Sequence, residues 1–245
     1  YEKPIDLSRY AKLEGVFDCI YNPLETMLIR DARALGVKAA NGLAMLVEQA
    51  RAAHNLYQIA KGLPTVGEEA TEEVVKNLSS ARRNIVLVGM AGSGKSAIGK
   101  RVAKRLGREF IDTDNEIEKL AGKSIPQIFE ESGEGYFREL ESQVVEQVCT
   151  RQGLVISTGG GAVLNERNVF FIKANGTCYL VTRDVDKLAT KDRPLSPDKE
   201  SAKRLYEQRK PIYLAVADIT VDNDGDIESA VEKIVSDFCN NERKI

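Results

Sequence analysis

The sequence lacks any block of charge of one sign. Its 245 residues include 35 lysines and arginines against 37 aspartates and glutamates, which leaves a formal net charge of −2. Nucleic acids and anionic membrane surfaces are bound by clustered positive charge. The composition therefore argues against a nucleic-acid partner and against a membrane-surface partner.

Long hydrophobic runs are missing as well. The longest apolar stretches, such as Ile85–Val88 and Leu154–Ile156, fall far below the roughly 20 residues that a membrane-spanning helix needs. No charged-then-apolar signal peptide opens the chain. These absences predict a soluble protein, and 42% hydrophobic positions over this length suffice for at least one full core.

Cysteine is scarce and shows no local pairing pattern. Cys19, Cys149, Cys178 and Cys239 are widely separated and form no CxxC motif. This pattern predicts reduced, buried thiols in a cytoplasmic protein. Residue 1 is Tyr rather than Met, which suggests a piece of a longer protein.

Two parts of different character are expected, with a boundary at about residue 80. Glycine, proline and acidic residues interrupt the hydrophobic pattern at residues 62–69. The first part is expected to hold a strand at 16–21 that ends before Asn22-Pro23, helices at 26–35 and 43–59, and a short linking helix at 68–78.

After residue 80, strands alternate with helices, which indicates a parallel sheet covered on both faces. Strands are expected at 84–88, 109–111, 154–157, 177–181 and 218–221, and helices at 95–106, 116–120, 124–131, 135–150, 166–174 and 226–238. The continuous apolar run at 84–88 is typical of a strand that is buried on both faces.

A phosphate-binding loop is predicted between the first of these strands and its helix. Residues 89–96, Gly-Met-Ala-Gly-Ser-Gly-Lys-Ser, fit the pattern GxxxxGK[ST] in the strand-to-helix context that the motif requires. Glycines let backbone N–H groups line an anion nest, Lys95 reaches the β- and γ-phosphates, and the Ser96 hydroxyl ligates Mg²⁺. A glycine-rich turn without a ligand would not explain the lysine and serine that follow it.

Two carboxylates follow the second strand, at the carboxyl edge where α/β sheets bind ligands. In Asp112-Thr113-Asp114, one aspartate can hold Mg²⁺ through water while the other accepts a proton from an attacking hydroxyl. The alternative for Asp114 is the N-cap of a helix that begins at Asn115. In most P-loop proteins the third strand ends in an acid, but here Gly159-Gly160-Gly161 follows it, which favours Asp112 as the metal carboxylate.

Three arginines complete the candidate set: Arg138, Arg193 and Arg209. Each alone is more often a solvated surface residue. Arginine forks suit carboxylates and phosphates, and a small acidic substrate beside ATP would need them. The three consecutive glycines would let such a ligand approach the backbone closely.

Taken in order, these motifs resemble shikimate kinase over residues of about 84–238. The quoted pattern is the P-loop, Asp-Thr-Asp, Phe-Arg-x-x-Glu, Gly-Gly-Gly, Arg-Pro-Leu and Arg-x-Pro-x-Tyr. The resemblance implies a P-loop, nucleoside-monophosphate-kinase-like three-layer α/β fold with a central parallel sheet. It also implies ATP- and Mg²⁺-dependent phosphorylation of the 3-hydroxyl of shikimate, in the synthesis of chorismate and aromatic amino acids.

The same resemblance implies roles for individual residues. The residues implied to bind shikimate are Asp114, on the reacting hydroxyl, Arg138 and Arg209, on the carboxylate, and Gly159, Gly160 and Gly161. Those implied to bind the nucleotide are Gly92, Ser93, Gly94, Lys95, Ser96 and Ala97, with Asn223 and Asp224 flanking adenine. Arg193 is implied to be a lid arginine that acts with Lys95 on the transferred phosphoryl group, and Ser96 and Asp112 are implied to hold the metal.

Two other functions stay open at this point. One is another small-metabolite P-loop kinase, such as a gluconate kinase. The other is a weakened nucleotide-binding regulatory module, because Ala97 stands where the family usually has threonine.

The leading segment resembles the C-terminal end of shikimate dehydrogenase. The resemblance rests on Tyr21-Asn22-Pro23-Leu24-Glu25-Thr26 and on the run from Gly42 to Ala50, and it implies that Tyr21 and Gln49 belong to a shikimate pocket. We therefore expect a dehydrogenase-like fragment at 1–60, a linker at 61–80 and a kinase domain at 81–245, as in a multifunctional enzyme. The fragment is small and mainly helical, and its exposed apolar surface is expected to dock or self-associate.

Overall fold

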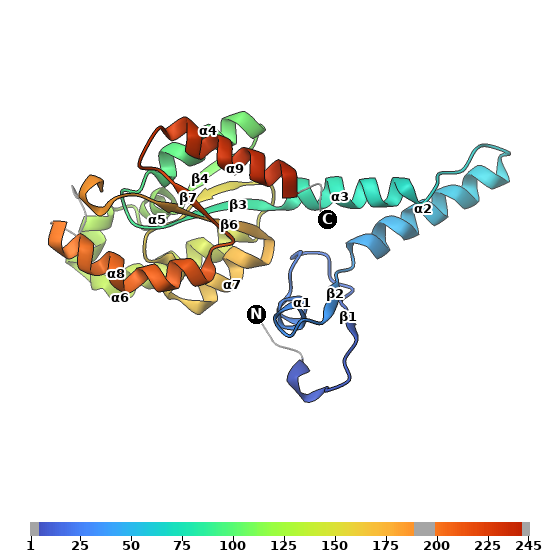
Figure 1. Cartoon of the computed structure of the whole chain (residues 1–245), viewed down its shortest axis with the longest axis horizontal. Coiled ribbons are helices and arrows are strands. Elements are labelled where there is room, and N and C mark those ends of the chain that lie inside the picture. The colour runs from blue at the N-terminus through green and yellow to red at the C-terminus, as the bar shows by residue number, and fades with distance from the viewer. Residues whose placement is uncertain (1–4, 189–198, 242–245) are drawn as a thin grey trace. The chain divides into compact units, whose positions relative to one another are not determined.

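The computed structural model describes residues 5–188 and 199–241, and the chain divides into two compact units. One unit comprises residues 1–83 with 241–245, and the other comprises residues 84–240. Figure 1 shows the elements of both units along the chain. The assignment of a dehydrogenase-like fragment, a linker and a kinase domain to these regions stays a prediction.

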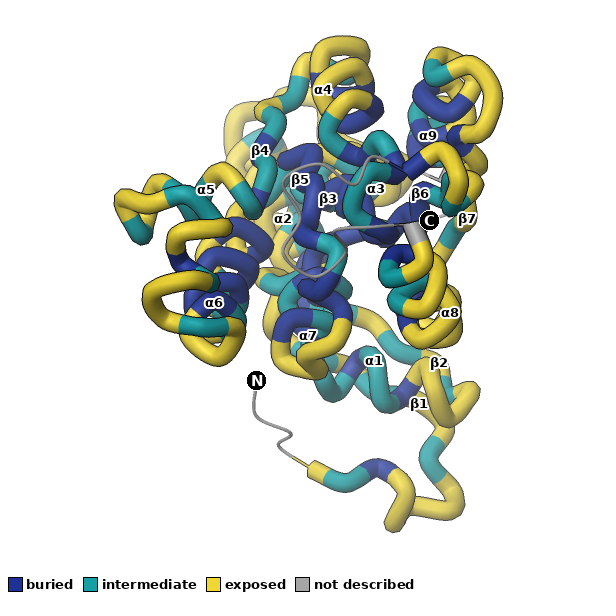
Figure 2. Tube along the Cα trace, turned by 90° about the vertical axis from the view of Figure 1, so that its left-hand side faces the viewer, coloured by how far each residue is buried: buried dark blue, intermediate teal, exposed yellow. Residues whose placement is uncertain are grey.

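The larger unit is built on a five-stranded parallel sheet with the strand order β4-β5-β3-β6-β7. The strands are β3 (Asn84–Val88), β4 (Phe110–Asp112), β5 (Val155–Ser157), β6 (Gly176–Thr182) and β7 (Ile219–Asp222). All five residues of β3 are buried, as its unbroken apolar sequence predicts, and Figure 2 shows the buried centre of the sheet.

Helices cover both faces of this sheet and make three layers (Figure 1). Ile85 and Leu87 of β3 pack in one core with α4 (Lys95–Leu106) and α9 (Ile227–Asn241). Val86 and Val88 point to the other face, into a core shared with α6 (Ile125–Cys149) and α7 (Glu166–Asn175). The alternation of side chains along each strand thus produces two cores, and the expected three-layer α/β fold is confirmed.

The sequence prediction was wrong at two places in this unit. The helices expected at 124–131 and 135–150 are joined as α6, where Gly133 breaks the helical geometry with a φ of +77°. No helix was expected at α8 (Lys199–Val216), which contains Pro211 in its interior. A proline inside a helix removes one backbone hydrogen bond, so local propensity alone argues against this helix. Its buried side chains Tyr213 and Val216 compensate by packing in the core on one face of the sheet.

The smaller unit contains a two-stranded parallel sheet of β1 (Gly15–Phe17) and β2 (Lys38–Ala40), connected by α1 (Met27–Ala34). The strand expected at 16–21 is shorter than predicted. The Asp18 side chain accepts the backbone N–H of Ile20 and the hydroxyl of Thr26, which turns the chain away from the ladder. Strand β2 was not expected, because three residues carry too little pattern.

Two helices complete this unit, α2 (Leu43–Ala60) and α3 (Glu69–Arg82). Their expected positions are confirmed, although α3 extends to Arg82. The connection between them is pinned by Asn55, whose side chain both donates to the Val66 carbonyl and accepts the Val66 N–H, each at 2.8 Å. Among the helices in the described ranges, none is long and apolar enough to cross a membrane.

None of the four cysteines, all of which lie in the described ranges, forms a disulfide, but they do not share one environment. Cys149 and Cys178 are buried, as expected, whereas Cys19 is exposed and Cys239 half-buried. The expectation of four buried thiols was therefore wrong for Cys19. It lies just after the Asp18 turn, outside the helices and strands of its unit, and the apolar neighbours in the sequence do not enclose its side chain.

These environments predict a graded reactivity toward a thiol reagent such as 5,5′-dithiobis(2-nitrobenzoate). Burial raises the pKa of Cys149 to about 12 and also raises the pKa of Cys178, so the reactive thiolate is scarce at both positions. We expect Cys19 to react within the first phase in the native protein, and Cys149 and Cys178 only after denaturation. Absorbance at 412 nm measures the released thiolate, and a Cys19→Ser variant should lose the first phase. Rapid native reaction of all four thiols would contradict the two-core packing.

Candidate active site at the carboxyl edge of the sheet

The loop between β3 and α4 forms an anion cradle. Gly94 adopts a φ of +98° just before α4, a conformation that favours glycine. The free N–H groups of the first turn of α4 therefore face the loop, where an anion can bind. Lys95 is buried, and its Nζ donates to the carbonyls of Gly89 and Met90 at 2.9 and 2.8 Å. Two carbonyls of the loop therefore hold the Lys95 ammonium at the phosphate-binding position. A bound phosphate would replace them as the hydrogen-bond acceptors of Lys95.

Asn223, which follows β7, supports this loop. Its Nδ2 donates to the Ser93 carbonyl at 2.7 Å, and a Cβ on Gly94 would lie only 2.3 Å from the same nitrogen. The structure thus gives Asn223 a contact with the cradle itself, while the expected place of Asn223 beside adenine stays a prediction.

A cluster of oxygens lies where a divalent cation would meet the phosphates. The Ser96 hydroxyl donates to Asp112 Oδ2 at 2.5 Å and lies 3.3 Å from the Ser157 hydroxyl. The sheet register brings these oxygens together, because Asp112 of β4 is paired with Ser157 of β5. In the described part of the chain no group of three or more histidines, cysteines or acids is found that could enclose a metal by itself. Hydroxyls and a single carboxylate fit Mg²⁺, which takes oxygen ligands and completes its shell with phosphates and water.

Asp112, and not Asp114, caps helix α5 (Thr113–Ala121). Its Oδ1 accepts the backbone N–H of Asp114 at 3.1 Å, so the alternative role weighed for Asp114 as the N-cap is wrong. The helix begins at Thr113, before both the expected start at 116 and the alternative start at Asn115, because the strand ends at Asp112 and this side chain is the first that can satisfy a free helical N–H. Asp114 then lies in the first turn of the helix, and its backbone N–H rather than its carboxylate takes part in the cap.

The carboxylate of Asp114 faces the glycine turn after β5. A Cβ on Gly159 would lie 2.7 Å from Asp114 Oδ1 and 2.9 Å from Glu141 Oε1. Thr113, the middle residue of the Asp-Thr-Asp run, is buried and its Oγ1 accepts the Gly159 N–H at 3.0 Å. Thr113 therefore ties the two aspartates to the turn, a role that the sequence did not reveal.

The next two glycines are each pressed against a different part of the site. A Cβ on Gly160 would lie 3.1 Å from the backbone nitrogen of Ala91 in the cradle, and one on Gly161 would lie 2.1 Å from Arg138 Nη1. Three glycines in a row are thus explained by three close approaches, to Asp114, to the cradle and to Arg138.

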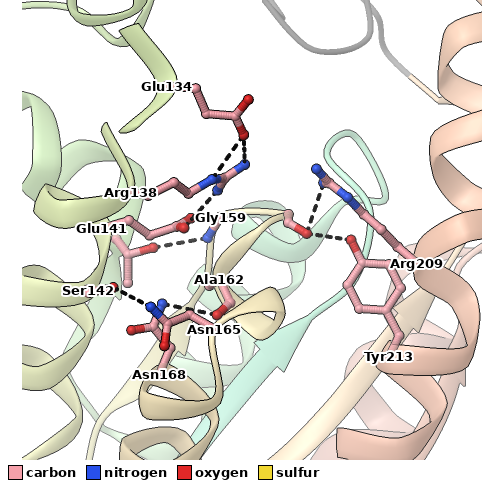
Figure 3. Close-up of polar contacts among 12 residues, drawn as sticks. Glu134, Arg138, Glu141, Ser142, Gly159, Ala162, Asn165, Asn168, Arg209 and Tyr213 are labelled. Atoms are coloured by element: carbon pink, nitrogen blue, oxygen red, sulfur yellow. Dashed lines mark hydrogen bonds and ion pairs between the residues drawn. The ribbon is translucent and has the colours of Figure 1, made fainter. Parts of the chain in front are cut away.

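Arg138 on α6 is held by two glutamates of the same helix, as Figure 3 shows. Its Nη1 donates to Glu141 Oε2 at 2.7 Å and its Nη2 to Glu134 Oε1 at 2.9 Å. Glu141 is only 1% exposed, and burial raises its pKa against the opposing charge of Arg138. Burial lowers the pKa of Arg138, but the neighbouring carboxylate of Glu141 opposes this effect. The net shift of the Arg138 pKa is upward, so the guanidinium stays charged.

One oxygen of this pair points into the site. Glu141 Oε1 is buried and faces Gly159, and no donor among the described residues forms a hydrogen bond to it. Sequence reasoning assigned Glu141 no role, although the spacing Arg138-x-x-Glu141 is a signal, because residues three apart on a helix lie side by side.

Helix α8 brings Arg209 to the opposite side of the glycine turn. Arg209 is buried, and its Nη1 donates to the Gly160 carbonyl at 3.2 Å. Tyr213, one turn further along α8, donates to the same carbonyl at 2.5 Å (Figure 3). Tyr213 was also missed as a candidate, although it closes the Arg-x-Pro-x-Tyr pattern.

The remaining expected residues are placed less directly. Asp224 Oδ1 accepts the Asp184 N–H at 2.7 Å, which lowers the pKa of Asp224, so this carboxylate joins the loops after β6 and β7. Ala97 is exposed in the first turn of α4. Arg193, the expected lid arginine, lies outside the described residues.

The geometry therefore combines three functions around one glycine turn. The cradle can bind a polyphosphate, Arg138 and Arg209 offer positive charge on two sides of the turn, and Asp114 presents a carboxylate between them. Such a set can bind a small acid and transfer a phosphoryl group to its hydroxyl.

Comparison with known proteins points to one family. A family model described as shikimate kinase matches residues 91–239. A shikimate kinase from Pelotomaculum thermopropionicum is 43% identical over 162 residues, which cover 62% of this chain and 94% of that protein. One from Histophilus somni is 38% identical over 169 residues, covering 65% of this chain and 97% of the relative.

Solved structures agree with these matches. A shikimate kinase from Acinetobacter baumannii in complex with shikimate superposes with a TM-score of 0.63 at 35% identity, covering 68% of this chain and 98% of that one. A shikimate kinase from Aquifex aeolicus has a TM-score of 0.57 at 38% identity, with 64% and 97% of the two chains covered.

Proposed function

The chain belongs to the shikimate kinase family, and on that premise we propose which of its residues carry the transfer of the γ-phosphoryl group of ATP to the 3-hydroxyl of shikimate. The activity itself is that of the family, a kinase that phosphorylates shikimate. One observation carries the assignment of residues: a single glycine turn abuts the phosphate cradle, Asp114, Arg138 and Arg209.

On the nucleotide side, the cradle residues Gly92 to Ala97 bind the phosphates of ATP. Lys95 leaves the carbonyls of Gly89 and Met90 and pairs with the β- and γ-phosphates, because an ammonium bonds a phosphate oxygen more strongly than a carbonyl. Ser96 and Asp112 would hold Mg²⁺, which when bound neutralises charge on the phosphate oxygens. Asn223 and Asp224 lie in the loop that flanks adenine.

On the acceptor side, Arg138 and Arg209 pair with the carboxylate of shikimate, and the glycine turn lets the ring approach the backbone. Asp114 accepts the proton of the 3-hydroxyl as its oxygen bonds to the γ-phosphorus. The bond from phosphorus to the bridging oxygen breaks, and ADP leaves. Arg193 acts on the charge of the moving phosphoryl group together with Lys95. The rate comes from positioning and charge stabilisation, without a covalent enzyme intermediate.

A coupled ADP-release assay tests this function. We expect ADP release to depend on shikimate and on Mg²⁺, and to stay at background with gluconate as the acceptor. Turnover with gluconate and none with shikimate would favour a different small-metabolite kinase. Nucleotide binding without turnover on either acceptor would favour a regulatory module.

We also propose that the leading segment is a dehydrogenase-like remnant of a multifunctional enzyme. Tyr21 and Gln49, which carry this resemblance, are both exposed. Phe17, Leu56 and Ile59 of this unit are also largely exposed, and apolar area of this kind supports docking or self-association. Solution mass measured across protein concentrations tests self-association.

The 245-residue chain is expected to produce no NADPH from NADP⁺ and shikimate. Hydride transfer needs a nicotinamide held beside the substrate carbon, and no glycine-rich dinucleotide fingerprint occurs before Val16. Absorbance at 340 nm measures the product, with a shikimate dehydrogenase added as a positive control. A rate above the enzyme-free blank would overturn the view of residues 1–60 as an inactive fragment.

Four cysteines without a disulfide support assignment of the protein to a reducing compartment, and we propose the cytoplasm. Fractionation of cells that express the natural protein tests this assignment. In that compartment its product would serve the synthesis of aromatic amino acids.

A further inference from the structure

Tyr213 reaches the active-site turn from the interior of the protein. Its side chain is 1% exposed and belongs to the core beneath the sheet, yet its hydroxyl ends at the Gly160 carbonyl, 2.5 Å away. The sulfur of Met90, in the phosphate cradle, lies 3.6 Å from the same hydroxyl. One phenol therefore meets both the cradle and the glycine turn.

The phenol has a single proton to donate, and the two neighbours are unequal acceptors. A carbonyl oxygen is a good acceptor, whereas a thioether sulfur is a weak one, so the proton goes to Gly160. Burial raises the pKa of Tyr213, which keeps the phenol protonated and a donor throughout the pH range of a kinase assay.

The carbonyl that Tyr213 holds is shared with a substrate-binding group. Arg209 Nη1 donates to the same oxygen at 3.2 Å, so two side chains of α8 form hydrogen bonds to one peptide carbonyl. That peptide joins Gly160, which is seated against Ala91 of the cradle, to Gly161, which is seated against the guanidinium of Arg138. Its orientation thus sets where both arginines lie relative to the turn.

We propose that Tyr213 is a positioning residue for the acceptor substrate: its hydrogen bond fixes the Gly160–Gly161 peptide and, through the shared carbonyl, the guanidinium of Arg209. The inference rests on the proposed function of Arg209 in binding the shikimate carboxylate. Without the phenolic proton, Arg209 is the remaining side-chain donor to the Gly160 carbonyl. The hydrogen bond from its guanidinium to this peptide then competes with the pairing of the same guanidinium with the substrate carboxylate. Tyr213 itself touches neither shikimate nor ATP.

The test is Tyr213→Phe in the full chain, which keeps the ring in the core and removes only the donor. The KM for shikimate is expected to rise about 3- to 10-fold, the effect of one lost neutral hydrogen bond, while kcat and the KM for ATP change by less than about twofold. A merely structural role would lower the melting temperature and the active fraction but leave KM unchanged. Because KM does not depend on the concentration of active enzyme, it can be measured even on a partly unfolded sample.

Tyr206→Phe provides the matched control. Tyr206 lies on the same helix and packs half-buried against the same core, but its ring stands under Lys210 rather than at the glycine turn. Its KM for shikimate is expected to equal the wild-type value. An unchanged KM in Tyr213→Phe overturns the inference alone, whatever the melting temperature. Absence of shikimate-dependent turnover in the wild-type chain would overturn the proposed function and this inference together.

Discussion

Replacing Asp114 by Asn is expected to lower kcat for shikimate by about 10²- to 10⁴-fold, the usual contribution of a general base. An amide has nearly the same size as the carboxylate but cannot accept the proton of the attacking hydroxyl. Nucleotide affinity is expected to stay within about twofold, because Asp114 faces the glycine turn while Asp112 faces Ser96 and the cradle.

Three measurements separate this role from a structural one. Coupled ADP release gives kcat, calorimetric titration with MgADP gives nucleotide affinity, and thermal unfolding reports the fold. Glu139→Gln, at an exposed position of α6, is the control for loss of one negative charge near the site and should leave kcat unchanged. More than about a tenth of the wild-type kcat in Asp114→Asn would show that another group takes the proton.

Arg209→Ala and Arg138→Ala are each expected to raise the KM for shikimate by about 10- to 150-fold. A hydrogen bond to a charged group contributes about 1.5–3 kcal/mol, and each truncation removes such a bond to the substrate carboxylate. The two variants should differ in stability. Arg138→Ala removes the guanidinium that donates to the buried Glu141 carboxylate, and a buried charge that has lost its hydrogen-bonded partner is strongly destabilising.

The double variant Arg138→Ala/Glu141→Gln separates binding from stability. Gln removes the buried charge, so the melting temperature should recover toward that of the wild type while the KM for shikimate stays high. Initial rates at varied shikimate and saturating ATP give KM, and thermal unfolding gives stability. An unchanged KM in both single variants would place the acceptor pocket away from the glycine turn.

Much of the fold could be predicted from the sequence because its signals are local. The apolar run of β3 and the glycines and lysine of the cradle are contiguous, and the structure places β3 and α4 at the expected residues. Helix α2 was also placed within about one residue, because apolar spacing is repeated over many turns. Short elements such as β2 carry too little repetition to be recognised, and α8 was hidden by Pro211.

The sequence by itself determined the chemistry that this protein carries: a phosphate cradle, two aspartates, three glycines and the arginines, in the order of one family. The tertiary structure alone decided how these groups divide the work. The register that sets Asp112 beside Ser157 and turns it toward Ser96 leaves Asp114 for the glycine turn, and α8 carries Tyr213 and Arg209 to one carbonyl. These contacts join residues far apart in the chain, and only the packing of helices on a shared sheet creates them, because no local preference encodes which distant backbone groups meet.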